Sequence, residues 1–107
     1  MKVSTDFLNY AMDRLSSVGN IRNRAMFGGY GIFHEGLMFA LIADDTLYFK
    51  VDESNRVMYE KAESQPFPQG ISYWEVPTEI LEDKNRIGEW AKISIDIANK
   101  KAKKKKR

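Results

Sequence analysis

Three glycines within four positions, set among large apolar residues, constrain the fold of this chain more than any other feature. The stretch comprises residues 24–33, RAMFGGYGIF. Glycine weakens a strand interior because it has no side chain to pack, so its presence indicates a bend or a close approach of another part of the chain. We therefore expect a bent first strand. The residues of this structural motif are Arg24, Met26, Phe27, Gly28, Gly29, Tyr30 and Gly31.

A phosphate-binding loop is the functional alternative for the same stretch. Such a loop places backbone N–H groups at the start of a helix, whereas these glycines lead into an apolar run typical of a strand, and no Lys-Ser or Lys-Thr pair follows. Arg24 could bind an anion, although an arginine at a strand entry more often pairs with an acid such as Asp52 or Glu75. A small-anion-binding domain or an enzyme that uses Arg24 and the glycine strand stays open as an alternative.

The residue types needed for metal or nucleophilic chemistry are scarce. The 107 residues contain no cysteine and one histidine, His34, which excludes disulfides, thiolate zinc sites and cysteine nucleophiles. The acidic pairs 44–45 and 52–53 fall where turns and helix caps favour short acids, and no serine, histidine and acid form a recognisable triad. We expect no enzymatic activity, no metal and no cofactor.

The charge of the chain is unevenly distributed. Residues 100–107 carry seven of the seventeen Lys and Arg, so residues 1–99 hold ten basic against fifteen acidic groups, a net charge of −5. We expect a folded domain over 1–99 and a basic tail over 100–107, which either solubilises the chain or tethers it to nucleic acid without sequence preference. The residues of this possible tether are Lys100, Lys101, Lys103, Lys104, Lys105, Lys106 and Arg107.

The distribution of apolar residues predicts a cytoplasmic α+β protein. No apolar run reaches the roughly 18 residues needed to cross a bilayer, and the N-terminus lacks the apolar segment of a signal peptide. Periodicity predicts a helix near 5–17 that Ser4 or Thr5 can cap, a polar link over 19–23, and a meander of strands over 24–33, 37–42 and 47–51. A second helix opened by residues 52–55, with Val57 and Met58 facing inward, a strand over 71–76 and a last helix capped by Asp83 are expected to follow. The expected fold is a two-layer antiparallel sheet packed against helices, in the order α-β-β-β-α-β(β)-α.

Two of these strands predict a partner surface. Residues 37–42 are all apolar, so both faces of this strand need cover, and we expect a homodimer or another partner on the face that carries Met38 and Ile42. Tyr73 and Trp74 point to opposite faces of their strand, so either both are covered within the fold or one is an exposed protein contact. The residues of the predicted partner surface are Met38, Ile42, Tyr73 and Trp74.

Several blocks of sequence, in order, resemble the N-terminal domain of the TfoX/Sxy regulators of bacterial competence. The blocks are residues 24–33 (RAMFGGYGIF), 36–42 (GLMFALI), 47–52 (LYFKVD), 66–67 (PF) and 72–77 (SYWEVP), within a match over about 7–98. The resemblance implies a cytoplasmic, non-enzymatic α+β domain. Full-length members regulate DNA-uptake genes together with the cyclic-AMP receptor protein, so transcription proteins are the implied partners. A lysine run stands where their second domain would begin, and a single-domain member can share the fold without the competence role.

Overall fold

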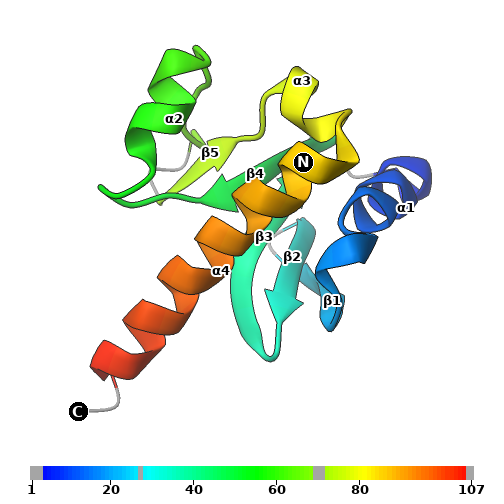
Figure 1. Cartoon of the computed structure of the whole chain (residues 1–107). Coiled ribbons are helices and arrows are strands. Elements are labelled where there is room, and N and C mark those ends of the chain that lie inside the picture. Colours follow the sequence, from blue (N-terminus) through cyan, green and yellow to red (C-terminus); the bar gives the residue numbers. More distant parts are fainter. Residues whose placement is uncertain (1–3, 27, 69–71, 106–107) are drawn as a thin grey trace.

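The computed structural model describes residues 4–26, 28–68 and 72–105. It contains one sheet with helices around it (Figure 1). The elements are α1 (Thr5–Arg14), the 3-10 helix η1 (Ser16–Val18), β1 (Ile21–Met26), β2 (Gly29–His34), β3 (Leu37–Ala43), β4 (Thr46–Lys50), α2 (Arg56–Lys61), β5 (Tyr73–Glu75), α3 (Thr78–Leu81) and α4 (Lys84–Lys105).

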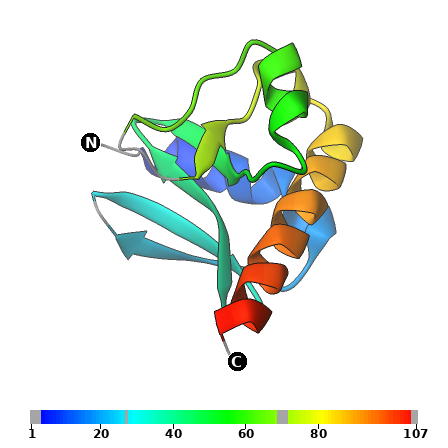
Figure 2. The ribbon, with the colours of Figure 1, turned by 90° about the vertical axis from the view of Figure 1, so that its left-hand side faces the viewer.

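The five strands form one antiparallel sheet in chain order, β1-β2-β3-β4-β5. Each described strand pairs with the next along the chain, and α4 packs against β3 and β4. Figure 2 shows α4 along one side of the sheet and the β1–β2 hairpin extending away from the helices. The expected α+β fold with an antiparallel meander and helical layer is confirmed.

The glycine stretch forms a hairpin rather than the single bent strand expected from the sequence. β1 ends at Met26, β2 begins at Gly29, and these two residues pair across the turn. Gly28 in that turn has a φ of 76°, a left-handed conformation that two-residue hairpin turns require. Phe27 lies outside the described residues. A bend and a turn both favour glycine, so the local sequence alone did not distinguish them.

A β-bulge changes which side chains of β3 face the core. Ile32 pairs with Ala40 but Phe33 pairs with Met38, so Phe39 is an additional residue on β3. Phe39 and Ala40 consequently both belong to the main core. Strict alternation therefore predicted the wrong grouping of side chains for this strand, because one inserted residue turns every later side chain to the other face of the sheet.

The two short helices differ from the sequence prediction in detail. Ser4 caps α1 by accepting the N–H of Phe7 at 3.1 Å, as expected, but α1 ends at Arg14 and η1 continues the segment. In α2, Tyr59 is fully buried whereas Val57, predicted to face inward, is 55% exposed. Met58, also predicted to face inward, packs against the main core beside Tyr59.

Helix α4 forms the second layer. It begins after Asp83, whose Oδ1 accepts the N–H of Asn85 at 3.0 Å, which confirms the predicted cap. Its buried residues are Ile87, Gly88, Ala91, Ser94, Ile95, Ile97 and Ala98. The helix continues without a break at residue 99 to Lys105, so the described part of the basic segment is helical rather than an extended tail.

Candidate interaction surface

The sheet face opposite α4 has a covered half and an open half. Over β4 and β5 it carries a second apolar cluster made of Leu41, Ala43, Tyr48, Phe67 and Tyr73. The ring of Phe67, from the loop before β5, packs edge-on against Tyr48 with 4.9 Å between ring centroids. This loop supplies part of the cover that we had expected from a partner.

The open half of this face lies over β1, β2 and the start of β3. A β-carbon on Gly31 would meet the sulfur atoms of Met26 and Met38 and the ring of Phe33, so these three half-buried side chains gather above Gly31. We call Met26, Phe33 and Met38 the Gly31 patch. Its side chains are apolar and adaptable, which suits contact with another molecule.

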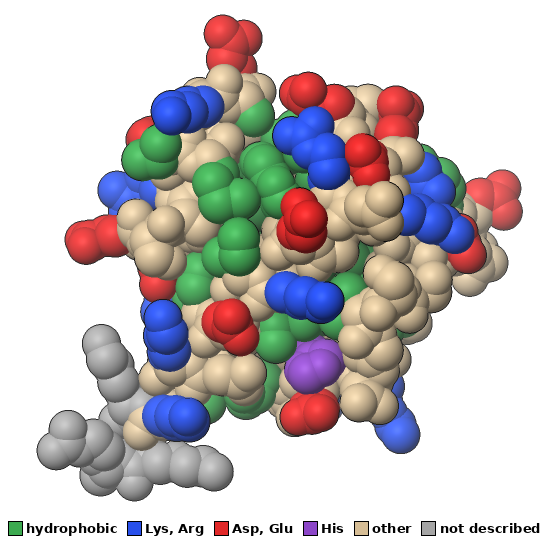
Figure 3. Space-filling model, viewed as in Figure 1, with side chains coloured by type: hydrophobic (Ala, Val, Ile, Leu, Met, Phe, Trp, Pro, Cys, Tyr) green, Lys and Arg blue, Asp and Glu red, His purple; other side chains and the backbone are tan. Residues whose placement is uncertain are grey.

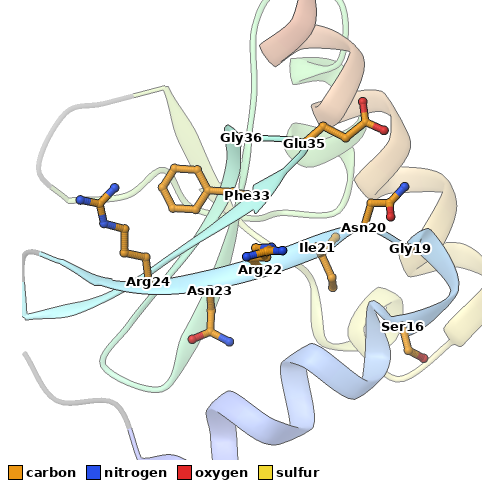
Figure 4. Close-up of a pocket in the computed structure, with 10 residues that line it drawn as sticks. All are labelled: Ser16, Gly19, Asn20, Ile21, Arg22, Asn23, Arg24, Phe33, Glu35 and Gly36. Atoms are coloured by element: carbon orange, nitrogen blue, oxygen red, sulfur yellow. The ribbon is translucent and has the colours of Figure 1, made fainter.

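Two arginines of β1 border this patch. Arg22 pairs with Phe33 and Arg24 pairs with Gly31, so both arginines share the face of the patch. An open groove of about 940 Å³ follows β1, where Arg24 and Phe33 point to one side of the strand and Asn23 points to the other (Figure 4). The remaining lining residues are Ser16, Gly19, Asn20, Ile21, Arg22, Glu35 and Gly36.

Arg22 and Arg24 are exposed and form no ion pair with any acidic group among the described residues. The expected pairing of Arg24 with Asp52 or Glu75 is therefore not present there. The two arginines lie two residues apart on one face of β1, whereas residues 1–99 as a whole have a net charge of −5. The groove is thus lined by two basic side chains and one acidic side chain, Glu35.

The glycines of the predicted motif shape the sheet and do not line this groove. Gly29 is buried, and a β-carbon there would overlap the main-chain carbonyl oxygen of Ile42. Gly31 provides the floor beneath the Gly31 patch. Arg24 and the glycines therefore do not surround one common anion site within the described residues. Gly29 and Gly31 instead allow the close packing of neighbouring parts of the sheet.

Comparison with known proteins assigns this fold and sequence to a family. The model of the TfoX N-terminal domain matches residues 13–98. The chain belongs to the TfoX N-terminal domain family. It is also 30% identical over 77 residues to the DNA transformation protein TfoX1 of Aliivibrio fischeri (strain ATCC 700601 / ES114). That alignment covers 65% of this chain and 36% of TfoX1, so the chain spans about a third of its relative.

In this TfoX N-terminal domain the four residues of the predicted partner surface do not share one face. Ile42 is 1% exposed and lies in the core beneath α4, because the bulge in β3 turns it inward. Trp74 also packs against the core, 6.4 Å from the ring of Tyr59. Met38 and Tyr73 lie on the opposite face, where the Tyr73 hydroxyl donates to the Met38 carbonyl oxygen at 3.5 Å.

The α4 side of the domain presents mixed charge. Acidic and basic side chains are interspersed there, and hydrophobic side chains gather between α2 and α4 (Figure 3). Lys100, Lys101 and Lys103 are exposed on the last turns of α4. Lys106 and Arg107 lie outside the described residues, as do the side chains of Lys104 and Lys105.

His34, the one histidine, ends β2 and is half-buried. The part of the chain that the structure describes holds no group of three or more His, Cys, Asp or Glu able to bind a metal. The carboxylate of Asp52 accepts the backbone N–H and the hydroxyl of Ser54 at 2.8 and 2.6 Å, and this hydroxyl bond lowers the pKa of Asp52. No helix among the described residues is long and apolar enough to cross a membrane.

Sequence inspection nominated Arg24 but missed Arg22 and Phe33. The signal was present as two arginines separated by one residue in a polar run directly before the glycines. Arg22 was missed because it lies within residues 19–23, which the sequence predicts as a polar link between elements. Once β1 is seen to start at Ile21, the period of two places both arginines on one face.

Proposed function

We propose that this chain is a cytoplasmic, non-enzymatic regulatory domain that acts through protein contacts in the control of DNA-uptake genes. The match to the TfoX N-terminal domain over residues 13–98 carries this proposal. The DNA transformation protein TfoX1 as a relative supports the link to DNA uptake. Transcription proteins, with the cyclic-AMP receptor protein first among them, are the proposed partners.

The open half of the sheet face supports a role in protein contact. Methionine, aromatic residues and arginine are residue types enriched at protein interfaces. Here Met26, Phe33 and Met38 lie beside Arg22 and Arg24 on the same face. A second copy of the chain on this face, giving a homodimer, is a further proposal that light scattering at high micromolar concentration tests.

The function is tested by recovering partners with tagged full-length protein from a bacterial lysate, with and without nuclease. Nuclease-resistant recovery of RNA polymerase or the cyclic-AMP receptor protein is the expected result. The recovery experiment is then repeated with the purified partner to establish direct binding. Recovery of DNA alone, lost after nuclease treatment, contradicts action through protein contacts.

A second candidate function is nonspecific binding of nucleic acid by the end of α4. The observation that favours it is the exposure of Lys100, Lys101 and Lys103 on a continuous helix, which holds their charges close together. Such binding weakens steeply with added salt because it depends on the release of counterions. Deletion of residues 100–107 should abolish retention on DNA at low salt, and unchanged retention of the shortened chain eliminates this candidate.

A further inference from the structure

We propose that the outer edge of β1 accepts an extended acidic segment of a partner protein as an added strand, selected by Arg22 and Arg24. This inference rests on the proposed function as a protein-contact domain. It names the surface that makes the contact and the chemistry of the segment that occupies it.

The outer edge of β1 offers main-chain hydrogen-bonding groups. Among the described strands β1 pairs only with β2. The Glu35 N–H donates to the Asn20 carbonyl oxygen at 3.4 Å, and in an antiparallel pair such bonding positions recur at every second residue. Arg22 and Arg24 therefore bond toward β2, and the N–H and C=O groups of Asn23 and Ala25 point to the outer edge. Alternating donors and acceptors along an open edge are what an extended peptide needs to add a strand.

The two arginines determine the charge of the segment. Successive residues of a strand alternate between faces, so an added strand brings residues two apart alongside Arg22 and Arg24. Glutamate or aspartate at those positions can accept paired hydrogen bonds from a guanidinium group. Both arginines are exposed and lack an acidic partner among the described residues, so they are available for this contact.

The shape of the surface is also suited to an added strand. The groove of about 940 Å³ extends to both sides of β1, with Phe33 on the arginine side and Ser16 and Asn23 on the other (Figure 4). Side chains of an incoming strand would thus find lining residues on either face. The Gly31 patch continues the arginine side of the groove toward β3 and can cover a longer apolar side chain.

A second copy of this chain pairs unfavourably with the same edge where the pairing is centred on residues 22–24. A symmetric antiparallel pairing centred at Asn23 places Arg22 of one copy opposite Arg24 of the other, twice. Centring the pairing on Arg22 or Arg24 places identical arginines opposite each other. Like charges directly opposite in a sheet are destabilising. An acidic segment removes this repulsion and replaces it with attraction.

Nucleic acid matches the edge less well than a peptide does. Phosphates would satisfy Arg22 and Arg24, but a nucleic acid strand has no regular series of N–H donors for the outward carbonyl groups of Asn23 and Ala25. The observations thus favour the protein partner.

The proposal is tested by titrating the full-length, isotope-labelled chain with a capped seven-residue peptide that alternates glutamate and valine. We expect the backbone amide signals of Asn23 and Ala25 to shift and their hydrogen exchange to slow, with weaker binding at high salt. The double variant Arg22→Glu, Arg24→Glu should weaken binding by at least about tenfold. Arg56→Glu with Arg86→Glu makes the same charge change at exposed helix positions and should bind far more strongly than the β1 variant.

A second variant separates strand addition from simple charge attraction. Asn23→Pro removes one outward N–H and keeps both arginines, and proline is tolerated on an edge strand where its nitrogen faces outward. It should abolish the slowed exchange at Ala25 while the chain stays folded by circular dichroism. The proposal is overturned if a lysine–valine peptide binds equally well, if the glutamate–valine peptide leaves the β1 amides unchanged, or if only an oligonucleotide shifts them.

The failure of this inference is distinguishable from failure of the proposed function. If the Arg22→Glu, Arg24→Glu variant recovers the same proteins from lysate as the unchanged chain, the partner does not use β1 and the inference fails, although the function stands. If the peptide adds at β1 but the unchanged chain recovers no regulator, strand addition stands and the regulatory function fails.

Discussion

Gly29 lies so close to the main-chain carbonyl oxygen of Ile42 that no β-carbon fits between them. The contact joins the start of β2 to β3, in the part of the sheet that supports the open face. Gly29→Ala should therefore lower the free energy of unfolding by about 3 kcal/mol, since the backbone has to shift. For a domain of this size that corresponds to a fall of more than about 10 °C in melting temperature, measured by thermal unfolding.

Gly88 provides the matched control for that substitution. It lies within α4, where a β-carbon would meet only the Ser17 hydroxyl, at 3.3 Å, and the exposed Ser17 side chain can rotate away. Gly88→Ala should raise the free energy of unfolding by about 0.5–1 kcal/mol, because alanine favours a helix over glycine. Equal stability of the two alanine variants would show that the approach of Ile42 to Gly29 is not tight.

Arg14 ties α1 to the end of α3. Its Nε donates to the Leu81 carbonyl oxygen at 3.1 Å, and a terminal nitrogen donates to the Glu82 carbonyl oxygen. Lysine cannot reproduce both bonds, so Arg14→Lys should lower the free energy of unfolding by about 1 kcal/mol in urea titrations. Arg22→Lys, at an exposed position without an ion pair, should change it by less than about 0.5 kcal/mol. Similar losses in both variants would contradict a specific role for Arg14.

Tyr59 buries a hydroxyl that makes no hydrogen bond to the described residues. Its neighbour Ser94 donates instead to the Lys50 carbonyl oxygen at 2.7 Å, and the Tyr59–Ser94 contact falls short of hydrogen-bond geometry. Tyr59→Phe keeps the ring against Trp90 and removes the unsatisfied group, so it should raise the free energy of unfolding by about 1 kcal/mol. A loss of stability of similar size would mean that Tyr59 and Ser94 are hydrogen-bonded after all.

The stability of the domain should decline in alkali because of its buried tyrosines. Burial raises the pKa of Tyr73 to about 12, and it raises the pKa of Tyr59 further above the usual value near 10.0. The folded chain keeps these protons while the unfolded chain releases them, so stability is complete below about pH 10 and falls as the pH rises toward 12. Each tyrosine contributes a slope of about 1.4 kcal/mol per pH unit.

Urea unfolding between about pH 9 and pH 11.5 measures this slope. Tyr73→Phe removes one titrating group and should reduce the slope above about pH 10.5 by about 1 kcal/mol per pH unit, with little effect below about pH 10, where the tyrosine is protonated in both states. An unchanged slope would indicate that Tyr73 ionises freely in the folded state.

Much of the architecture could be predicted because it depends on local and periodic signals. The turn acids at Asp44 and Asp45, the caps at Ser4 and Asp83 and the apolar stripe of α4 each specify their element from a few neighbouring residues. The hairpin in the glycine stretch was harder to predict, since a bend and a turn both favour glycine for the same conformational freedom.

The candidate surface was harder to predict because it depends on register. One additional residue at Phe39 reverses the later side chains of β3 and places Ile42 in the core. No property of the local sequence marks that bulge, which is selected by the fit of β3 between β2 and α4. The described part of the loop that carries Phe67 packs over β4 and β5, which is likewise a contact between distant segments.

The sequence by itself determined the α+β class, the antiparallel meander, the capped final helix and the absence of cysteine chemistry, because these follow from periodicity, turn residues and composition. The sequence also contained the blocks that resemble the TfoX N-terminal domain. Only the tertiary structure decided that Arg22, Arg24 and Phe33 border one open edge and that Gly29 must lack a side chain. These relationships join residues of different strands, and pairing between strands depends on long-range packing that no single segment specifies.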